Sequence, residues 1–492
     1  MNKQIETRIF GNAGILIGTQ VFTKLIGTIF TIVVARKLGV EDYGLYAFAV
    51  TFGHVFGIGA LFGFPRLITR DVARETEKTN ETLGSILVLE AVLSCLAIVA
   101  MVLTLSLLGY SFDRILIVSI AGSATILTIL LDVVAAFFRA HHRMDLEARM
   151  RFSASFLNMS LGAGVLLLGY GILELAVIQF IVFSIVLIFG LYMIFGKLAR
   201  PSITLKWHIL RKPLESSWPF FLSSVCVLIY GSVATIFLSM MKGDHVTGLY
   251  AGAMNFTRIV GFLPASLVGA FLPAMAQLWR SSPDDWWTVY LRSVKYLIIM
   301  ALPITVGLVM LSDQFVPIVL GNEYAEVATI LKMVAWVILL IFLNWGMSNA
   351  LISIDREKTE MRIVMVVMVF NIFTNLLLIP GWGVYGAVIT SLLTEGLMLL
   401  ILSIVLSKAG FRLPLSHLSL KPVISVGVMA VSVHFTRDIG LISTVLTAAA
   451  VYPLTLFVLK TFDKEELELM RSGWTVVLAR LTGRYKREPS RP

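Results

Sequence analysis

The chain has 492 residues, of which 58% are hydrophobic and 14% are charged, and its net charge is +10. Soluble proteins contain about 25% charged residues, so this composition excludes an ordinary water-soluble domain. The charged residues cluster between windows of about 20 almost uncharged residues, as expected for membrane-spanning helices. Because the basic residues lie between these windows, we interpret the positive charge as topological and expect no nucleic-acid partner.

The N-terminal stretch predicts a retained membrane helix rather than a cleaved signal peptide. Its apolar residues continue to about Val34 and include Gln20 and Lys24, without a small-residue cleavage site. Farther along the chain, Cys95 and Cys226 lie inside apolar runs. Their spacing predicts neither a disulfide framework nor a metal site.

The apolar segments, taken in order, predict an all-α integral membrane protein with about fourteen transmembrane helices. The predicted spans are 12–35, 43–64, 83–109, 115–138, 152–171, 172–196, 217–240, 248–276, 289–312, 326–352, 361–379, 383–407, 421–437 and 440–460. Each is long enough to cross roughly 30 Å of hydrocarbon. The fifth and sixth spans form a tight hairpin, as do the last two, so totals of about twelve or thirteen spans are the alternatives.

The distribution of Lys and Arg predicts the orientation in the membrane. With the N-terminus inside, cytoplasmic segments contain basic clusters around Arg70, Arg143 and Lys206. The opposite loops contain only Arg36, Lys37, Arg114, Lys242 and Arg437. We therefore predict a multi-pass protein of the cytoplasmic membrane with both termini in the cytoplasm.

Two short repeats indicate an internal duplication. The residues GLYAFA at 44–49 recur as GLYAGA at 248–253, and GYG at 169–171 recurs as GWG at 381–383. The alternative explanation is a shared preference for glycine and aromatic residues where helices begin. Duplication of an even number of spans would relate the halves by an axis along the membrane normal.

The repeats and spans predict the domain organisation. The expected units are an N-terminal six-helix lobe (1–196), a C-terminal six-helix lobe (197–407), two peripheral transmembrane helices (408–460) and an amphipathic cytoplasmic tail (461–492). In the tail, apolar residues recur at helical spacing among arginines, which is typical of a helix lying on a membrane surface. A frayed soluble helix is the alternative for this segment.

The stretch ARKLGVEDYGLY at 35–46 resembles the signature of the polysaccharide transporter family. These are oligosaccharide flippases of the multidrug/oligosaccharidyl-lipid/polysaccharide (MOP) exporter superfamily. In that pattern a Leu-Gly-x-x-x-Tyr-Gly-like turn precedes a glycine-rich second helix and a basic segment, here RLITRDVAR at 66–74. The resemblance implies a MATE-like fold, in which two lobes give alternating access to a central cavity, with the last two helices peripheral.

The same resemblance implies the substrate and the partners. The expected substrate is an oligosaccharide joined by phosphate or pyrophosphate to a polyprenyl carrier, moved across the cytoplasmic membrane for polysaccharide or glycoconjugate biosynthesis. Membrane lipids are expected partners, together with a glycan polymerase or glycosyltransferases. The resemblance does not identify the glycan.

Basic residues inside predicted spans are the candidates for substrate binding, because charge in hydrocarbon usually faces a cavity or a partner. Lys24 and Arg258 lie near the middle of their spans, and His54 takes the place of Arg258 in the first repeat. Arginine and lysine are suited to binding phosphate, so we predict that all three residues line the substrate cavity. Ion pairing or snorkelling is the alternative for the two cations, and simple packing is the alternative for His54.

Acidic residues inside predicted spans are the candidates for ion coupling to a proton or sodium gradient. Glu90 and Asp132 lie at similar depth on consecutive antiparallel helices and would share a proton or sodium ion if they faced each other. Separate pairing, for example of Asp132 with Arg139, is the alternative. Glu395 is a further ion-coupling candidate that would balance a cavity cation.

Catalytic motifs are not evident in the sequence. The Walker pattern G-x-x-x-x-G-K-[ST] is absent, and the histidines at 141 and 142 have no other ligand types at metal spacing. We therefore expect a transporter rather than an enzyme, with no catalytic residues, no cofactor and no metal site. The alternatives are a cation-coupled multidrug exporter, which would need an acidic, aromatic-lined cavity, and a membrane polymerase or ligase acting on lipid-linked glycans.

Overall fold

The computed structural model describes residues 3–71, 79–141, 143–198 and 207–468, and within these ranges every regular element is a helix. Eleven helical segments are long and apolar enough to cross a membrane. Two of them, α1 (Lys3–Leu61) and α12 (Glu357–Lys408), each contain two legs joined at a glycine. Together with α5 (Met144–Leu167), these segments account for all of the predicted spans. The predicted all-helical, multi-pass fold is therefore confirmed.

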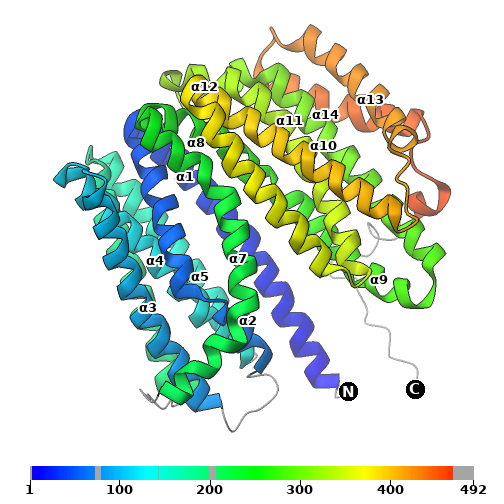
Figure 1. Ribbon diagram of the computed structural model, residues 1–492. Helices are drawn as coiled ribbons and strands as arrows, with labels where there is room; N and C mark the ends of the chain where they lie inside the picture. The colour runs from blue at the N-terminus through cyan, green and yellow to red at the C-terminus, as the bar shows by residue number, and fades with distance from the viewer. Residues whose placement is uncertain (1–2, 72–78, 142, 199–206, 469–492) are drawn as a thin grey trace.

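The helices form two groups that meet at one end and spread apart at the other (Figure 1). The first group, the N-terminal lobe, contains α1, α2 (Phe64–Asp71), α3 (Thr79–Leu107), α4 (Phe112–Ala140), α5 and α6 (Ile172–Met193). The second group, the C-terminal lobe, contains α7 (Trp207–Lys242), α8 (Asp244–Val260), α9 (Phe262–Ser281), α10 (Pro283–Val319), α11 (Ala325–Ser353) and α12. We call the two ends the joined end and the splayed end. The N-terminus lies at the splayed end. Of the helices of the C-terminal lobe, α7 packs on α12 and α8 but also reaches α2 and α3 of the N-terminal lobe at the splayed end.

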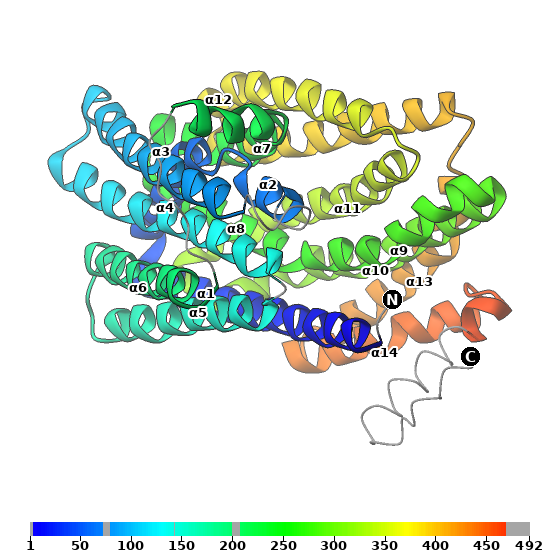
Figure 2. The same ribbon diagram turned by 90° about the horizontal axis from the view of Figure 1, so that it is seen from below.

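Two further helices, α13 (Leu415–Thr436) and α14 (Leu441–Val458), pack beside α10 on the outside of the C-terminal lobe. The view from the splayed end separates α3–α6 on one side from α9, α10, α11 and α13 on the other (Figure 2). The tail helix predicted after these elements falls mostly within residues 469–492, which lie outside the described residues.

Glycines allow the chain to turn back within α1 and α12. Gly39 has φ +77° and Gly383 has φ +54°, in the region that only glycine occupies without strain. The loop predicted between the first two spans is therefore reduced to one non-helical residue, Gly39, and the loop predicted between the eleventh and twelfth spans is reduced to Gly383. The hydroxyl group of Tyr324 donates to the carbonyl oxygens of Ala35 (2.9 Å) and Gly39 (3.0 Å), which the turn removes from the helical ladder.

The predicted eighth span, 248–276, is confirmed as one membrane-crossing segment, Asp244–Ser281, although its helix is interrupted at Gly261 between α8 and α9. The amide of Gly261 still bonds to the carbonyl of Thr257 (2.8 Å). Pro264 follows within the next turn, where it lacks an amide proton and cannot continue the ladder. The glycine and proline were visible in the sequence and could have predicted the break.

The two repeated glycine segments lie against each other at the joined end. A Cβ atom on Gly44 would lie 1.8 Å from the carbonyl oxygen of Asp244, and one on Gly248 would lie 1.9 Å from that of Val40. Both distances are far below van der Waals contact, so only glycine fits at either position. The repeat thus marks the place where the lobes approach most closely, and buried apolar residues of both lobes share one core there.

Polar contacts also connect the lobes at the joined end. Arg114 on α4 donates two hydrogen bonds to the carboxylate of Asp244 on α8, at 2.7 and 2.9 Å. Its guanidinium also lies over the ring of Tyr110, 4.5 Å from the centroid. The side-chain amide of Asn255 on α8 donates to the hydroxyl oxygen of Tyr43 on α1 (2.5 Å). Sequence analysis assigned Arg114 only to a loop. Each of the two loops contains one charge of each sign, Asp113 with Arg114 and Lys242 with Asp244, so the sequence did not single out this pair.

Candidate functional site

A cavity of about 350 Å³ lies between α1 of the N-terminal lobe and α8 of the C-terminal lobe. Lys24 and Arg258 both line it, and both side chains are exposed rather than packed against protein. Neither cation has a salt-bridge partner among the described residues. We call this space the central cavity. Two cations and no acidic residue line it, so its charge is suited to binding an anion.

The structure does not place His54 among the residues that line the central cavity. It is half-buried on the second leg of α1, within electrostatic range of Arg258 and Asp132. Its predicted role in substrate binding, like those of Lys24 and Arg258, stays a prediction.

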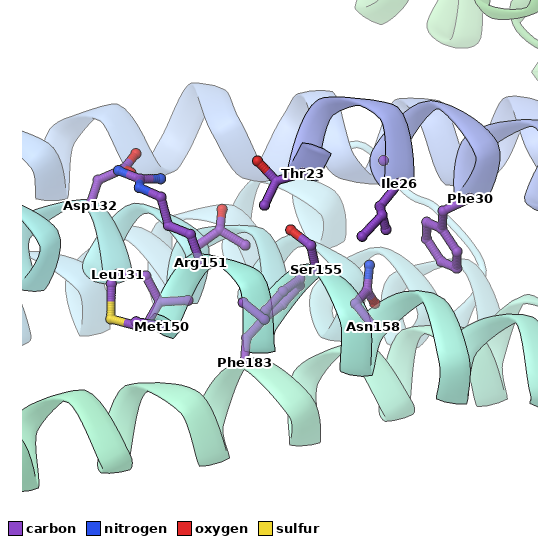
Figure 3. Close-up of a pocket in the computed structure, with 13 residues that line it drawn as sticks. Thr23, Ile26, Phe30, Leu131, Asp132, Met150, Arg151, Ser155, Asn158 and Phe183 are labelled. Atoms are coloured by element: carbon purple, nitrogen blue, oxygen red, sulfur yellow. The ribbon is translucent and has the colours of Figure 1, made fainter. Parts of the chain in front are cut away.

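A second cavity, of about 310 Å³, lies inside the N-terminal lobe and is bordered by α1, α4, α5 and α6 (Figure 3). We call it the N-terminal cavity. Asp132 and Arg151 form an ion pair on its wall, with 2.9 Å between carboxylate oxygen and guanidinium nitrogen. Ser155 and Asn158 on α5 line the same space, and their polar ends point toward α1 in Figure 3.

The ion pair of the N-terminal cavity continues as a chain of four charges. Arg151 also donates to Glu147 (2.9 Å), and the same carboxylate oxygen of Glu147 accepts from Arg139 (2.5 Å). Glu147 has a fully buried side chain, while Arg139 and Arg151 are partly exposed. The alternative pairing of Asp132 with Arg139 is therefore wrong, because each of these residues has a different partner. Arg151 belongs to the basic cluster around Arg143 that sequence analysis used only to predict the orientation in the membrane, so its contact with Asp132 was missed.

Glu90, the predicted neighbour of Asp132, is buried on α3 with 1% of its surface exposed. It lies within electrostatic range of Asp132, but the oxygen Oε1 of Glu90 has no hydrogen-bond partner in the described part of the chain. The hydrogen-bonding partner of Asp132 is Arg151. The roles of Glu90 and Asp132 in ion coupling stay predictions.

A third cavity, of about 410 Å³, lies inside the C-terminal lobe and is bordered by α7, α11 and α12. Glu395 lines this C-terminal cavity and not the central one, so it does not lie beside Lys24 or Arg258 as a counter-charge. Its carboxylate accepts hydrogen bonds from the hydroxyl of Tyr230 and from the amide of Asn344 (2.6 Å).

The C-terminal cavity also contains polar atoms without partners. Glu360 lines it as a second acid, and no lysine or arginine does. The oxygens Asn344 Oδ1 and Ser348 Oγ are buried and have no hydrogen-bond partner among the described residues. Buried polar atoms in this state usually indicate a bound water or ligand. The three cavities therefore differ in the charged residues that line them: two cations, one ion pair, and two acids.

The equivalence of the two lobe cavities follows from the internal repeat. The offset that relates Gly44 to Gly248 also relates Ile26, in the N-terminal cavity, to Tyr230, in the C-terminal cavity. The offset that relates Gly171 to Gly383 likewise relates Asp132 to Asn344 and Phe183 to Glu395. The cavities occupy the same place in each copy of the duplicated unit.

The helical, two-lobed architecture with a cationic space between the lobes defines a class of multi-pass membrane proteins. A family model described as polysaccharide biosynthesis protein matches residues 9–279, and one described as MatE matches residues 219–377. The first match covers more than half of the chain, and the chain therefore belongs to this polysaccharide biosynthesis family. The resemblance to polysaccharide transporters of the MOP superfamily is confirmed.

Relatives and solved structures are consistent with this assignment. The chain is 24% identical to a protein named probable flippase AglR from Haloferax volcanii, over 92% of this chain and 97% of AglR. Its fold is similar to that of the lipid II flippase MurJ in an inward closed conformation, with a TM-score of 0.76 and 15% identity over 90% of this chain and 98% of MurJ. An inward-facing multidrug MATE transporter gives a TM-score of 0.64 and 16% identity over 79% of this chain and 95% of that chain. The predicted MATE-like fold is confirmed.

Proposed function

We propose that this protein is a flippase that moves a polyprenyl phosphate- or pyrophosphate-linked oligosaccharide across the cytoplasmic membrane. The observation that carries the proposal is the central cavity, to which each lobe contributes one cation, Lys24 and Arg258, without a salt-bridge partner among the described residues. The family assignment, the flippase name of AglR and the MurJ-like fold support it. The proposal makes the protein a transporter, with the lipid-linked glycan as substrate and glycan-assembling enzymes as partners.

The charge of the central cavity argues against a cationic drug as substrate. Lys24 and Arg258 repel each other, and two like charges are tolerable only if the space is wet or an anion occupies it. A phosphate group meets this requirement and must lose water to cross the membrane. Arg258 offers it paired hydrogen bonds, and Lys24 offers a point charge.

Transport in this proposal proceeds by alternating access. The joined end, where Gly44 and Gly248 meet, faces the outside, and the splayed end faces the cytoplasm with both termini. Opening toward the outside requires the bonds between Arg114 and Asp244 and between Tyr43 and Asn255 to break. The substrate then faces the opposite side of the membrane without crossing lipid on its own.

The test is surface display of the glycan in a strain that lacks the native protein, with membrane abundance measured in parallel. We expect Arg258→Ala to lower export more than about tenfold, because charge-assisted hydrogen bonds contribute about 1.5–3 kcal/mol. Arg258→Lys should keep part of the activity, since the charge stays but the paired geometry is lost. Lys24→Ala should lower export less.

Arg280→Ala is the matched control, because Arg280 lies at the end of α9 with 76% of its side chain exposed and pairs with Asp355 outside the cavity. It should export normally. Full export by well-inserted Arg258→Ala and Lys24→Ala variants would contradict the anionic substrate.

The C-terminal cavity favours a second element of the proposal, coupling to a proton or a sodium ion. Glu395 and Glu360 line it without a cation, and Asn344 Oδ1 and Ser348 Oγ lack partners in the described part of the chain. Carboxylate, amide and hydroxyl oxygens are ligands suited to a hard cation, and a buried carboxyl group can instead carry a proton. The variants that test this coupling are given below.

A further inference from the structure

We propose that the N-terminal cavity binds one sugar residue of the carried glycan while the phosphate lies in the central cavity. This inference rests on the proposed function and names the part of the substrate that a second cavity would take. The N-terminal cavity is separate from the space that holds Lys24 and Arg258. Its size, its charge and its position beside the central cavity each favour a sugar.

The charge of the N-terminal cavity favours a neutral ligand. Asp132 and Arg151 are the charged residues that line it, and their ion pair leaves no net charge on the wall. A phosphate would be repelled by the carboxylate, and a metal cation or drug cation by the guanidinium. A neutral group that both donates and accepts hydrogen bonds suits both partners, and sugar hydroxyl groups do so.

The polar groups of this cavity match the pattern of donors and acceptors on a sugar ring. Arg151 supplies N–H donors, Asp132 supplies carboxylate acceptors with 49% of its side chain exposed, and Ser155 supplies a hydroxyl. The oxygen Asn158 Oδ1 is buried and accepts no hydrogen bond from the described residues. The rings of Phe30 and Phe183 add apolar surface for the C–H face of a pyranose.

The size of the cavity limits the ligand to about one sugar. Its volume of 310 Å³ is at the lower limit of the range of about 300–1,000 Å³ for small-molecule sites. One pyranose ring with a few waters fits, whereas an oligosaccharide does not.

Gly27 places the sugar cavity directly beside the phosphate cavity. It lines both cavities, with Ile26 facing the N-terminal cavity and Thr28 facing the central one. A Cβ atom built on Gly27 meets no atom within 4 Å, so the missing side chain leaves space at the border. A helix is about 10 Å across with its side chains, so a sugar near the phosphate can lie past Gly27 while the phosphate contacts Lys24.

The experiment compares two phosphodiester probes, farnesyl methyl phosphate and farnesyl phosphoryl glucose, which have the same single negative charge and differ in whether the phosphate carries a methyl group or a sugar. Binding to the purified full chain is measured by calorimetry. We expect wild type to bind the glucosylated probe about tenfold more tightly, because two or so hydrogen bonds of ordinary net strength give that factor. Ser155→Leu fills the N-terminal cavity, and Gly27→Leu fills the border between the cavities. Each should reduce the ratio of the two affinities to about one.

Gly164→Leu is the matched control, because Gly164 is also a helical glycine with no atom within 4 Å of its Cβ position and lines neither cavity. It should keep the tenfold ratio. Equal binding of both probes by wild type, or a ratio that survives both Ser155→Leu and Gly27→Leu, would overturn the sugar site and leave the flippase proposal intact. Failure of wild type to bind either probe would overturn the flippase proposal and the sugar site with it.

Discussion

The N-terminal and C-terminal cavities lie at equivalent positions in the two lobes but contain different polar groups. In the N-terminal cavity an acid is paired with a base, as Asp132 is with Arg151. In the C-terminal cavity Glu395 is held by neutral donors, the hydroxyl of Tyr230 and the amide of Asn344. The two cavities thus share a position relative to the repeated segments and differ in their lining.

The difference separates residues that hold the fold together from residues that can change charge during transport. In the ion chain from Asp132 through Arg151 and Glu147 to Arg139, the fully buried Glu147 lies between two cations, so we expect this chain to stay charged and in place during transport. Glu395 can gain a proton and keep its neutral partners. We therefore expect mutations in the N-terminal cavity to change stability and those in the C-terminal cavity to change ion dependence.

The largest expected effect is that of Arg151→Ala on stability. This substitution leaves Asp132 unpaired and leaves the fully buried Glu147 with Arg139 as its single cationic partner. The Asp132 and Arg151 side chains are 49% and 32% exposed, so solvent screens their pair and the cost should be about 1–2 kcal/mol rather than that of a fully buried pair. We therefore expect a lower thermal midpoint by fluorescence-detected size-exclusion chromatography. Arg143→Ala is the control, because Arg143 and Asp145 are exposed partners whose loss should cost less than about 1 kcal/mol. Equal midpoints for the two variants would remove the distinction between the lobes.

The second effect is that of Glu395→Gln on ion dependence. The amide has the same shape, accepts a hydrogen bond from Tyr230 and cannot ionise, so the fold should remain. Transport should lose its dependence on pH or sodium, measured by uptake into vesicles with an imposed gradient of each ion. Asp132→Asn is the matched variant in the N-terminal lobe. Because Asp132 is paired with Arg151, we expect its remaining transport to keep that dependence, and loss of the dependence would instead support the ion-coupling role predicted for Asp132 from sequence. An unchanged ion response in Glu395→Gln would assign Glu395 a purely structural role.

The spans, the duplication and the joining of Lys24 and Arg258 at one cavity could be predicted from sequence. Hydropathy determines which segments cross the bilayer, and the repeat determines which helices of the two lobes face each other. The partner of Asp132 could not be predicted, because it depends on how each helix is rotated about its axis. Lipid and protein core are both apolar, so the sequence of a membrane helix carries only a weak pattern that specifies this rotation.

The contact between Tyr230 and Glu395 shows the same limit over a longer range. The two residues are far apart in the chain, on α7 and on the second leg of α12, and each lies in a predicted span without a visible partner. By contrast, the glycine contacts at the joined end could have been inferred from the repeat. Two glycines that recur at matching positions, where two helices must cross, predict a close approach.

A smaller effect concerns the joined end, where the two lobes meet. Asp244→Asn removes the charge that binds Arg114 across the lobes. Hydrogen bonds to a charged group contribute about 1.5–3 kcal/mol. The fraction of molecules whose lobes are separated at the joined end should therefore rise about tenfold or more. Spin labels at positions 107 on α3 and 326 on α11 should report a longer-distance component. Asp113→Asn, an exposed neighbour on α4, is the control, and an identical distance distribution in both variants would show that the pair does not hold the end closed.

The smallest expected effect is the loss of thermal stability at low pH. It compares two ionic contacts, that of Glu466 with Lys295 in the C-terminal half and that of Asp145 with Arg143 in the N-terminal lobe. Burial alone would raise the pKa of Glu466, but hydrogen bonds from Lys295, from Tyr296 and from the backbone amide of Asp463 lower it below its ordinary value. In the N-terminal lobe the hydrogen bonds from Arg143 lower the pKa of Asp145.

A carboxylate whose pKa is lowered by folding stabilises the protein fully above its unfolded pKa, and this contribution is lost as the pH falls through the folded value. Glu466 lies after α14 and is buried, whereas Asp145 is partly exposed, so solvent screens its pair more strongly. Glu466→Gln should therefore flatten the loss of thermal stability below about pH 5 by up to about 1 kcal/mol, and Asp145→Asn should flatten it less. The thermal midpoint measured from pH 7 to pH 2 tests this order, because both carboxylates have pKa values below their ordinary ones and are protonated only in that acidic range. A larger effect in Asp145→Asn would contradict this order. It would mean that the contact of Glu466 with Lys295 does not hold the residues after α14 to α10.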